Sequence, residues 1–255
     1  MDDIIRIMPC LDMQDGRVVK GIHFVDIKDA GDPVASAQVY EKAGADELAL
    51  LDITATVEGR KTTLNIVRQV SEVISIPFTV GGGICDVRSA ARVLKAGADS
   101  ISVSSAAFRD PELIKDLVKE FGSWAVTVAI DVDHNKEMPS GYEVYIDGGR
   151  TPTGHDALEF AKKIDNYGAA VILPTSKRGD GSREGYDLPI IRLLAENVKA
   201  EIVASGGAGT FEHFYEAVQA GAKILLAASV FHYHIIDIPE LKKYLQNKGV
   251  KVSVK

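Results

Sequence analysis

The sequence predicts an α/β protein that folds as a (β/α)8 TIM barrel built from two similar (β/α)4 halves. Eight short apolar runs alternate with helical patterns along the 255 residues, which favours an all-parallel sheet. No Gly/Ser-rich linker divides the chain, so we expect one domain over residues 1–255, with half-barrels of about 1–123 and 124–255. A doubly wound sheet is the weaker alternative, because no G-x-G-x-x-G motif follows the first strand.

The eight expected strands share nearly continuous apolar sequence, as strands of a parallel sheet do when both faces are buried. They are residues 5–12, 47–52, 77–81, 100–104, 125–131, 170–175, 201–205 and 223–228. Between them, segments such as 33–44 and 86–97 carry apolar residues at three- and four-residue spacing, which predicts helices.

An internal repeat favours a closed barrel over an open sheet. An offset of 124 residues superimposes Gly44 on Gly168 and Ser105 on Ser229. The register therefore persists from residue 44 to residue 229 without an insertion, as expected for two halves of similar structure.

Composition excludes several classes of function. The formal net charge of −7 provides no basic field for nucleic acid or an anionic membrane. There is no signal peptide pattern and no apolar run of about 18 residues, and the basic tail 242–255 is expected to be a solvated helix end. Cys10 and Cys85 lie far apart in sequence, which suits a reducing cytoplasm, and the histidines form no metal-binding motif. We therefore expect a soluble cytoplasmic protein with no metal and no cofactor.

Two glycine pairs stand in register after the third and seventh expected strands. Gly82–Gly83 is followed by Ser104 and Ser105 at the end of the next strand, and Gly206–Gly207 is followed by Ser229. Glycine lets backbone N–H groups approach an anion, and a following helix presents its positive end there. Two ordinary turns are the alternative. The repeat favours two phosphate sites on opposite sides of one barrel mouth, and thus a substrate with a phosphate at each end.

Two carboxylates are expected midway between these sites. Asp12 ends the first strand and Asp131 the fifth, and these strands face each other across an eight-stranded barrel. Such a pair suits general acid–base chemistry, with one group donating a proton while the other accepts one. A helix cap or an ion pair is the alternative for each. Lys20, in the long segment after the first strand, is placed to cover the mouth as part of a lid or to be a solvated loop lysine.

The sequence also resembles a known family over nearly its full length. The blocks CLDMQDGRVVKG, ELALLDITA, FTVGGGI, GYEVYIDGGR, DGSREGYD and IVASGGAG follow one another as in the cyclase (synthase) subunit of imidazole glycerol phosphate synthase, from histidine biosynthesis. The resemblance implies a barrel that uses ammonia from a separate glutaminase subunit. Its substrate would be the bisphosphorylated phosphoribulosyl-formimino aminoimidazole carboxamide ribotide. Its products would be imidazole glycerol phosphate and aminoimidazole carboxamide ribotide.

The resemblance also implies roles for individual residues. The family's acid–base aspartates fall on Asp12 and Asp131, and its flexible-loop lysine falls on Lys20. The residues implied to bind phosphate or line the mouth are Gly83, Ser104, Ser105, Thr175, Asp180, Gly181, Ser205, Gly207, Ala228 and Ser229.

One departure from the family lies after the sixth strand. The family reads T-S-x-D-R-D-G where this chain reads TSKRGDG, so that Arg178 and Gly179 replace an Asp and an Arg. We expect Arg178 to compensate electrostatically near the second phosphate.

A second departure concerns the ring of charges that closes the amino-terminal end of the family's ammonia channel. Arg6 and Glu47 are present, but Ser100 and Val171 replace a Lys and a Glu. Trp124 replaces a partner-facing Gln, while Asp99 is retained. Half of the gate is therefore expected to be missing, which implies a looser channel entrance or an altered glutaminase interface.

Three other interpretations remain open on sequence alone. The first is the sister phosphoribosyl isomerase barrel, which shares the half-barrel repeat and bisphosphate recognition. The second is a cyclase-like, ammonia-using subunit recruited to sugar modification. The third is a non-catalytic barrel that binds a phosphometabolite.

Overall fold

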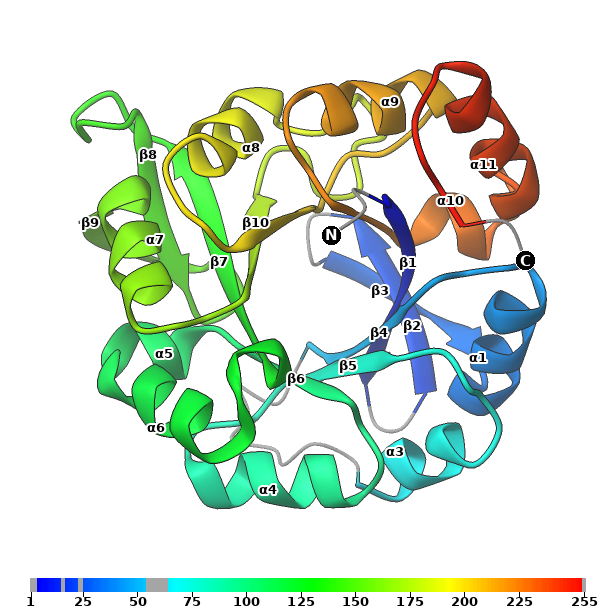
Figure 1. The fold of residues 1–255 in the computed structure, drawn as a ribbon, viewed down its shortest axis with the longest axis horizontal. Helices are drawn as coiled ribbons and strands as arrows, with labels where there is room; N and C mark the ends of the chain where they lie inside the picture. Colours follow the sequence, from blue (N-terminus) through cyan, green and yellow to red (C-terminus); the bar gives the residue numbers. More distant parts are fainter. Residues whose placement is uncertain (1–3, 15–16, 23–24, 54–63, 254–255) are drawn as a thin grey trace.

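A closed parallel barrel forms the centre of the protein (Figure 1). The structure is a computed structural model that describes residues 4–14, 17–22, 25–53 and 64–253. Within these residues, the strands of the barrel are, in order, β1 (Arg6–Gln14), β4 (Leu48–Asp52), β5 (Phe78–Gly81), β6 (Ser100–Val103), β7 (Val126–His134), β10 (Val171–Ser176), β11 (Glu201–Ala204) and β12 (Ile224–Ala227). A parallel ladder between β7 and β10, from Val171–Thr127 to Ser176–Val132, and another between β12 and β1 complete the barrel. The expected fold and all eight strands are confirmed, with ends within three residues of those predicted.

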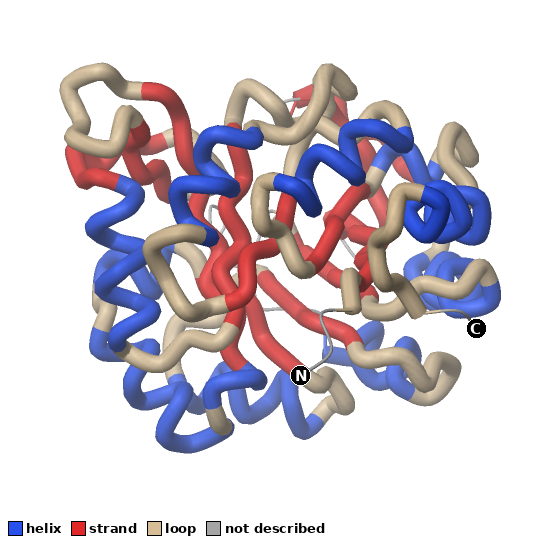
Figure 2. Tube along the Cα trace, turned by 45° about the horizontal axis from the view of Figure 1, so that its top comes forward, coloured by secondary structure: helices blue, strands red, loops and turns tan. Residues whose placement is uncertain are grey.

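Helices surround the strands on the outside, as Figures 1 and 2 show. They are α1 (Pro33–Lys42), α3 (Leu64–Ser71), α4 (Val87–Lys95), α5 (Ser105–Arg109), α6 (Glu112–Phe121), α7 (Ala157–Asn166), α8 (Leu188–Ala195), α9 (Phe211–Gln219), α10 (Ser229–His232) and α11 (Ile238–Asn247), with a 3₁₀ turn η1 (Ser123–Ala125) before β7. No helix of the described residues is long and apolar enough to cross a membrane.

Helix starts follow from local sequence. Asp32, Asp156 and Asp237 cap α1, α7 and α11 by accepting hydrogen bonds from backbone N–H groups of the first turn. Asp86 and Ser89 form a reciprocal capping box at α4. These caps satisfy N–H groups that have no partner within the helix, so each of these four helices starts at a defined residue.

The core has two layers. They arise because side chains along each strand point alternately outward, toward the helices, and inward, into the barrel. One large cluster, which includes the fully buried Phe214, fills the space between strands and helices. A smaller cluster inside the barrel includes Met8, Leu173 and Leu226. Strand alternation also turns buried hydroxyl side chains of β5, β6 and β7 inward, namely Thr79, Ser102 and Thr127. The barrel interior is therefore apolar on one side and hydroxyl-bearing on the other.

Two strands of the barrel extend beyond its mouth as antiparallel sheets. β1 pairs with β2 (Arg17–Ile22), which pairs with β3 (Val25–Gly31). β7 pairs with β8 (Tyr142–Ile146), which pairs with β9 (Thr151–Asp156), and these two lie outside the main ring in Figure 1. The apolar pattern of the sequence did not predict these four strands. They matter because β1 and β7 also carry the expected catalytic aspartates.

The basic tail is not wholly a solvated helix end, which corrects the expectation from sequence. Lys242 is only 7% exposed, and its Nζ lies 2.7 Å from Asp46 Oδ1 and 2.8 Å from Ser253 Oγ. Asp46 also accepts a 2.9 Å hydrogen bond from the backbone N–H of Ile7. The pair therefore fastens α11 to the start of β1.

We expect Lys242→Ala to destabilise the fold, because it leaves the buried Asp46 carboxylate without its cation. Loss of one partner of a buried ion pair costs about 3–5 kcal/mol. Thermal unfolding should show a fall in melting temperature of roughly 6–20 °C, at about 2–4 °C per kcal/mol. Lys243→Ala, at an exposed neighbouring position, is the matched control and should be nearly neutral. Equal melting temperatures for the two variants would contradict this account.

Candidate active site

The carboxyl ends of the strands meet at one mouth, and the two expected catalytic aspartates lie on opposite sides of it. Asp12 is on β1 and Asp131 on β7, which are four places apart in the closed order of eight strands. The two glycine-rich turns follow β5 and β11, which are also opposite each other. Around the ring, every second strand therefore carries either an aspartate (β1 and β7) or a glycine-rich turn (β5 and β11), and the two kinds alternate.

Asp131 sits in surroundings that disfavour its charge. Burial, and then the neighbouring charge of Asp180, raise the pKa of Asp131 to about 6. A hydrogen bond from the Gly149 backbone N–H and the charges of Lys177 and Arg150 act in the opposite direction on this pKa. This raised pKa of Asp131 suits a group that gains and loses a proton not far from neutral pH.

Two hydroxyl side chains continue the polar rim beside Asp131. Thr175 of β10 is the ladder partner of Asp131, and it forms an isolated bridge with Ser205. The Thr175 Oγ1 hydroxyl donates to Ser205 Oγ at 3.3 Å. The structure therefore brings these three predicted residues onto adjacent strands at the mouth.

Asp12 has a neighbour that the sequence motifs did not single out for the site. The Cys10 thiol donates to Asp12 Oδ1 over 3.3 Å. Cys10 is buried inside the barrel, two residues earlier on the same strand, so both side chains point inward. The contact could have been predicted from the sequence, because side chains two residues apart on a strand lie on the same face. The side chain of Lys20 lies outside the described part of the chain, although its backbone belongs to β2.

The first glycine-rich turn follows β5. Gly82 and Gly83 both have positive φ, and a Cβ on Gly82 would lie 2.4 Å from the Asp52 carbonyl oxygen. Close packing therefore already requires glycine at position 82. On the next strand, Ser104 precedes the short helix α5 and makes no side-chain cap. The Ser105 hydroxyl instead accepts a 2.9 Å hydrogen bond from the Asp147 backbone N–H.

The second glycine-rich turn follows β11 and packs against the loop after β10. A Cβ on Gly207 would lie 2.0 Å from the Gly185 carbonyl oxygen, and the Gly185 N–H donates to the Gly207 carbonyl at 2.7 Å. Asp180 lies beside Gly206, since a Cβ there would lie 3.4 Å from the Asp180 Cα. The turn, Asp180 and the adjoining Gly181 therefore share one corner of the mouth. Ala228 and Ser229 start the short helix α10 after the adjacent strand, β12, and its first turn has no side-chain cap.

Arg178, which was expected near the second phosphate, pairs with a carboxylate of β7, and its role at a phosphate stays a prediction. Its Nε donates to Asp133 Oδ1 at 2.8 Å, and the Arg178 side chain is 67% exposed. The guanidinium therefore forms an ion pair with a carboxylate of β7, and this contact joins the loop after β10 to β7.

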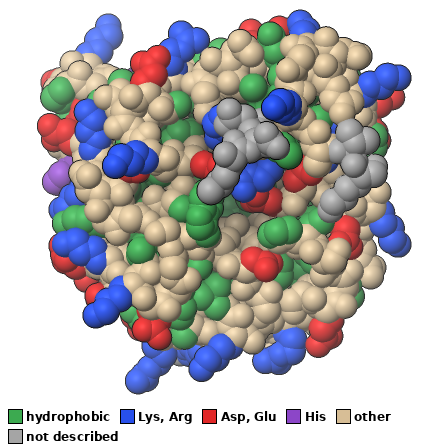
Figure 3. Space-filling view, viewed as in Figure 1, with side chains coloured by type: hydrophobic (Ala, Val, Ile, Leu, Met, Phe, Trp, Pro, Cys, Tyr) green, Lys and Arg blue, Asp and Glu red, His purple; other side chains and the backbone are tan. Residues whose placement is uncertain are grey.

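The amino-terminal end of the barrel is also charged, through a cluster of Arg6, Glu47 and Glu201. Arg6 forms a 2.8 Å ion pair with Glu47 and a second ion pair with Glu201. Glu201 of β11 is the ladder partner of Val171 of β10. A carboxylate therefore lies beside position 171, where this chain has Val in place of the family's Glu. Figure 3, a view along the barrel, shows acidic and basic side chains near a hollow at the centre.

The expectation that half of the gate is missing rests on Ser100 and Val171 and stays a prediction, but Glu201 adds a charge at this end of the barrel. Three charged side chains, not two, meet at the start of the strands. Burial raises the pKa of Glu47, Arg6 lowers it, and the negative charges of Glu201 and Asp46 raise it further. Ser100 replaces a charge with a hydroxyl that shares a 2.7 Å hydrogen bond with Thr79 Oγ1.

Two further residues lie at the amino-terminal end. Trp124, in the turn η1 before β7, is 58% exposed, which is unusual for so large an apolar side chain. The Asp99 carboxylate accepts a 3.0 Å hydrogen bond from the Phe78 backbone N–H, which starts β5. Among the residues that the structure describes, no group of three or more His, Cys, Asp or Glu side chains could hold a metal ion.

The fold and the mouth together define a (β/α)8 barrel protein with opposed aspartates and glycine-rich turns at the carboxyl ends of its strands. Residues 6–237 match the family described as histidine biosynthesis protein, and the chain belongs to this family. It is 49% identical over 256 residues to imidazole glycerol phosphate synthase subunit HisF of Pyrobaculum aerophilum, with both chains covered completely.

The raised pKa of Asp131 predicts that Asp131→Asn stabilises the protein at neutral pH. The native state holds this proton more tightly than the unfolded chain, so ionisation of Asp131 lowers stability as the pH rises from about 4 to about 6. Asn carries no charge, so the variant should gain about 1–3 kcal/mol at pH 8 and almost nothing at pH 4. Urea unfolding at both pH values measures this difference. A gain of equal size at pH 4 and pH 8 would show that the charge of Asp131 is not its cause.

Proposed function

We propose that this chain is the ammonia-using cyclase subunit of imidazole glycerol phosphate synthase, which acts in histidine biosynthesis. It converts the bisphosphorylated phosphoribulosyl-formimino aminoimidazole carboxamide ribotide into imidazole glycerol phosphate and aminoimidazole carboxamide ribotide. The observation that carries this proposal is the arrangement of the mouth, with aspartates on β1 and β7 between glycine-rich turns after β5 and β11. The full-length similarity to the Pyrobaculum aerophilum subunit agrees with it.

The proposed mechanism uses the two ends of the substrate to fix its middle. One phosphate binds near Gly83, Ser104 and Ser105, and the other near Asp180, Gly181, Gly207, Ala228 and Ser229. Backbone N–H groups of glycine turns and of short helix starts suit such anions. A substrate held in this way spans the mouth from the β5–β6 side to the β11–β12 side, so its central atoms lie between β1 and β7.

Asp12 and Asp131 then exchange protons with the central part of the substrate. The pKa of about 6 lets Asp131 hold or release a proton near neutral pH. Asp12 approaches from the opposite strand, so one carboxyl group can donate while the other accepts. Thr175 and Ser205 provide hydroxyl groups at the edge of the same space.

Ammonia reaches this space through the barrel in the proposed function. The barrel interior offers the hydroxyl groups of Thr79, Ser102 and Thr127, which are buried and can exchange hydrogen bonds with a small neutral molecule. The charged cluster of Arg6, Glu47 and Glu201 lies at the amino-terminal end of this path. We infer that a glutaminase subunit docks at this end and supplies the ammonia.

The first experiment is turnover of the bisphosphate substrate by the isolated chain with an ammonium salt at alkaline pH. Asp12→Asn and Asp131→Asn should each lower kcat by about 100-fold or more, as expected for loss of a general acid or base. Asp116→Asn changes an exposed aspartate of α6 and is the matched control, with wild-type kcat expected. A wild-type protein that binds the substrate but does not turn it over would contradict the proposed function.

A second experiment tests where the glutaminase docks. Trp124 is the single tryptophan of the chain, so 5-fluorotryptophan labels one site. Its ¹⁹F resonance should shift when the unlabelled glutaminase subunit is added, because docking covers this exposed side chain. A trifluoromethyl tag on the exposed Cys85, beyond the carboxyl end of β5, is the control and should not shift. Binding that shifts only the Cys85 tag would place the partner at the mouth instead.

A further inference from the structure

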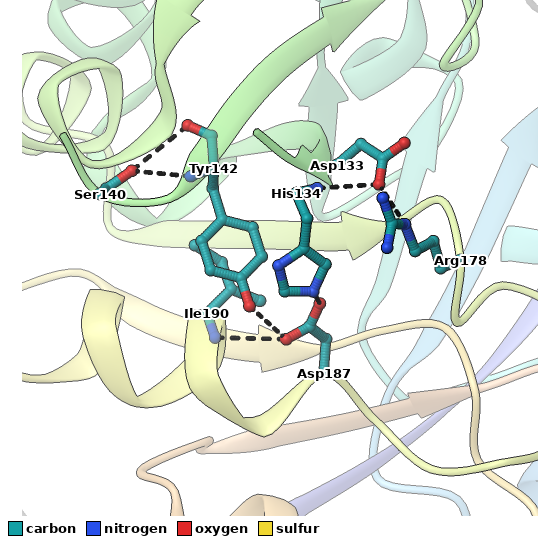
Figure 4. Close-up of polar contacts among 7 residues, drawn as sticks. All are labelled: Asp133, His134, Ser140, Tyr142, Arg178, Asp187 and Ile190. Atoms are coloured by element: carbon teal, nitrogen blue, oxygen red, sulfur yellow. Dashed lines mark hydrogen bonds and ion pairs between the residues drawn. The ribbon is translucent and has the colours of Figure 1, made fainter. Parts of the chain in front are cut away.

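The loop between β10 and α8 carries Asp180 and Gly181, and both of its ends are fastened to the extension of β7. Figure 4 shows the side chains that make these contacts. Asp133 and His134, the last two residues of β7, come from beyond the barrel ladder, where β7 pairs with β8. Each of them contacts one end of the loop.

Asp133 holds the start of the loop. The Arg178 Nε donates to Asp133 Oδ1 at 2.8 Å, and the Lys177 backbone N–H donates to the Val132 carbonyl at 3.0 Å. Asp133 is the more buried partner, with a side chain 20% exposed against 67% for Arg178. The first two residues after β10 therefore follow β7 instead of turning freely into solvent.

His134 and Tyr142 hold the end of the loop through Asp187. The Tyr142 hydroxyl donates to Asp187 Oδ1 at 2.7 Å, and His134 Nε2 lies 3.3 Å from Asp187 Oδ2. The two rings also contact each other, with centroids 4.4 Å apart. Burial and the bond to Asp187 raise the pKa of Tyr142, so its hydroxyl keeps the proton that it donates. Asp187 caps α8, so the helix start is fastened as well.

Between these ends, the loop is shaped by short backbone contacts. The Asp180 N–H donates to the Ser176 carbonyl at 3.0 Å, and the Ser182 hydroxyl donates to the Gly179 carbonyl at 2.8 Å. These bonds are local and tighten the turn, but they do not fix its position over the mouth. The Gly185 N–H also donates to the Gly207 carbonyl, and the Tyr186 hydroxyl donates to the Leu226 carbonyl at 2.8 Å. The side-chain contacts with Asp133, His134 and Tyr142 add to these and hold the loop against the extension of β7.

We propose that Asp133 and His134 form a two-point clamp that positions the phosphate-binding loop. Asp133 acts through Arg178, and His134 acts with Tyr142 through Asp187. Both are positioning residues, because neither needs to touch the substrate. The proposal rests on the proposed function, in which Asp180 and Gly181 bind one phosphate. It also gives Arg178 a reason to stand where the family has an aspartate, because the partner on β7 is acidic in this chain.

The kinetic test uses the Asp133–Arg178 pair, with circular dichroism of each variant to confirm that it is folded. Asp133→Ala and Arg178→Ala should each raise the KM for the bisphosphate by about three- to tenfold, with kcat within about twofold of wild type. The double variant Asp133→Ala/Arg178→Ala should raise KM no more than either single change does. The reversed pair, Asp133→Arg with Arg178→Asp, should restore most of the affinity. Lys115→Ala, which breaks a 2.8 Å surface pair within α6, is the matched control.

The reversed pair separates the clamp from direct binding of phosphate by Arg178. Direct binding predicts that Arg178→Asp raises KM whatever stands at position 133. A clamp predicts rescue, because the reversed charges attract each other again. Failure of the reversed pair to improve on Arg178→Asp alone would overturn the proposal.

A second readout does not depend on turnover. Amide hydrogen exchange of residues 179–185 in the unliganded protein should quicken in Arg178→Ala and in Tyr142→Phe, since either change frees one end of the loop. Lys115→Ala should leave these amides unchanged. Unchanged exchange in both loop variants would overturn the clamp, even with an active wild type. An inactive wild type with faster exchange in the variants would instead retain the clamp and contradict the proposed function.

Discussion

The ladder between β7 and β10 is the constraint on which the rest of the structure depends. Its paired residues, from Val171–Thr127 to Ser176–Val132, join the two halves of the chain on one side, as β12 and β1 do on the other. Closure of the ring makes β1 and β7 opposite strands, and β5 and β11 likewise. In an open sheet, the same side chains would lie along a line. Only the closed ring turns them into a mouth with facing aspartates and facing glycine turns.

Charge is buried near both ends of this barrel, with different consequences. At the mouth, burial and the acidic neighbour Asp180 raise the pKa of Asp131 to about 6. These surroundings favour proton exchange by Asp131, but its ionisation lowers the stability of the folded protein. At the amino-terminal end, Arg6 lies between Glu47 and Glu201, and nearby Lys242 pairs with Asp46. These ions compensate one another, and they connect β1, β4, β11 and α11.

The extension of β7 beyond the ladder links the strand that carries Asp131 to the neighbouring loop. Asp131 faces the mouth, while Asp133 and His134, two and three residues later, contact the loop that carries Asp180. One strand therefore positions both the carboxylate that we propose to exchange protons and the turn that we propose to bind a phosphate. A shift of β7 would move Asp131 and this loop together, which preserves the geometry between them.

The sequence by itself determined the eight barrel strands, the half-barrel repeat, the glycine turns and the positions of Asp12 and Asp131, because each depends on local pattern or on strand order. Tertiary structure alone decided which charges meet. Arg178 pairs with Asp133, Arg6 with Glu201, and Lys242 with Asp46 across 45, 195 and 196 residues of chain. No local periodicity encodes such a contact, since it depends on which strands become neighbours and how far each side chain reaches. For the same reason, a lysine in the basic tail is buried, and the arginine of the loop after β10 has a carboxylate partner on β7.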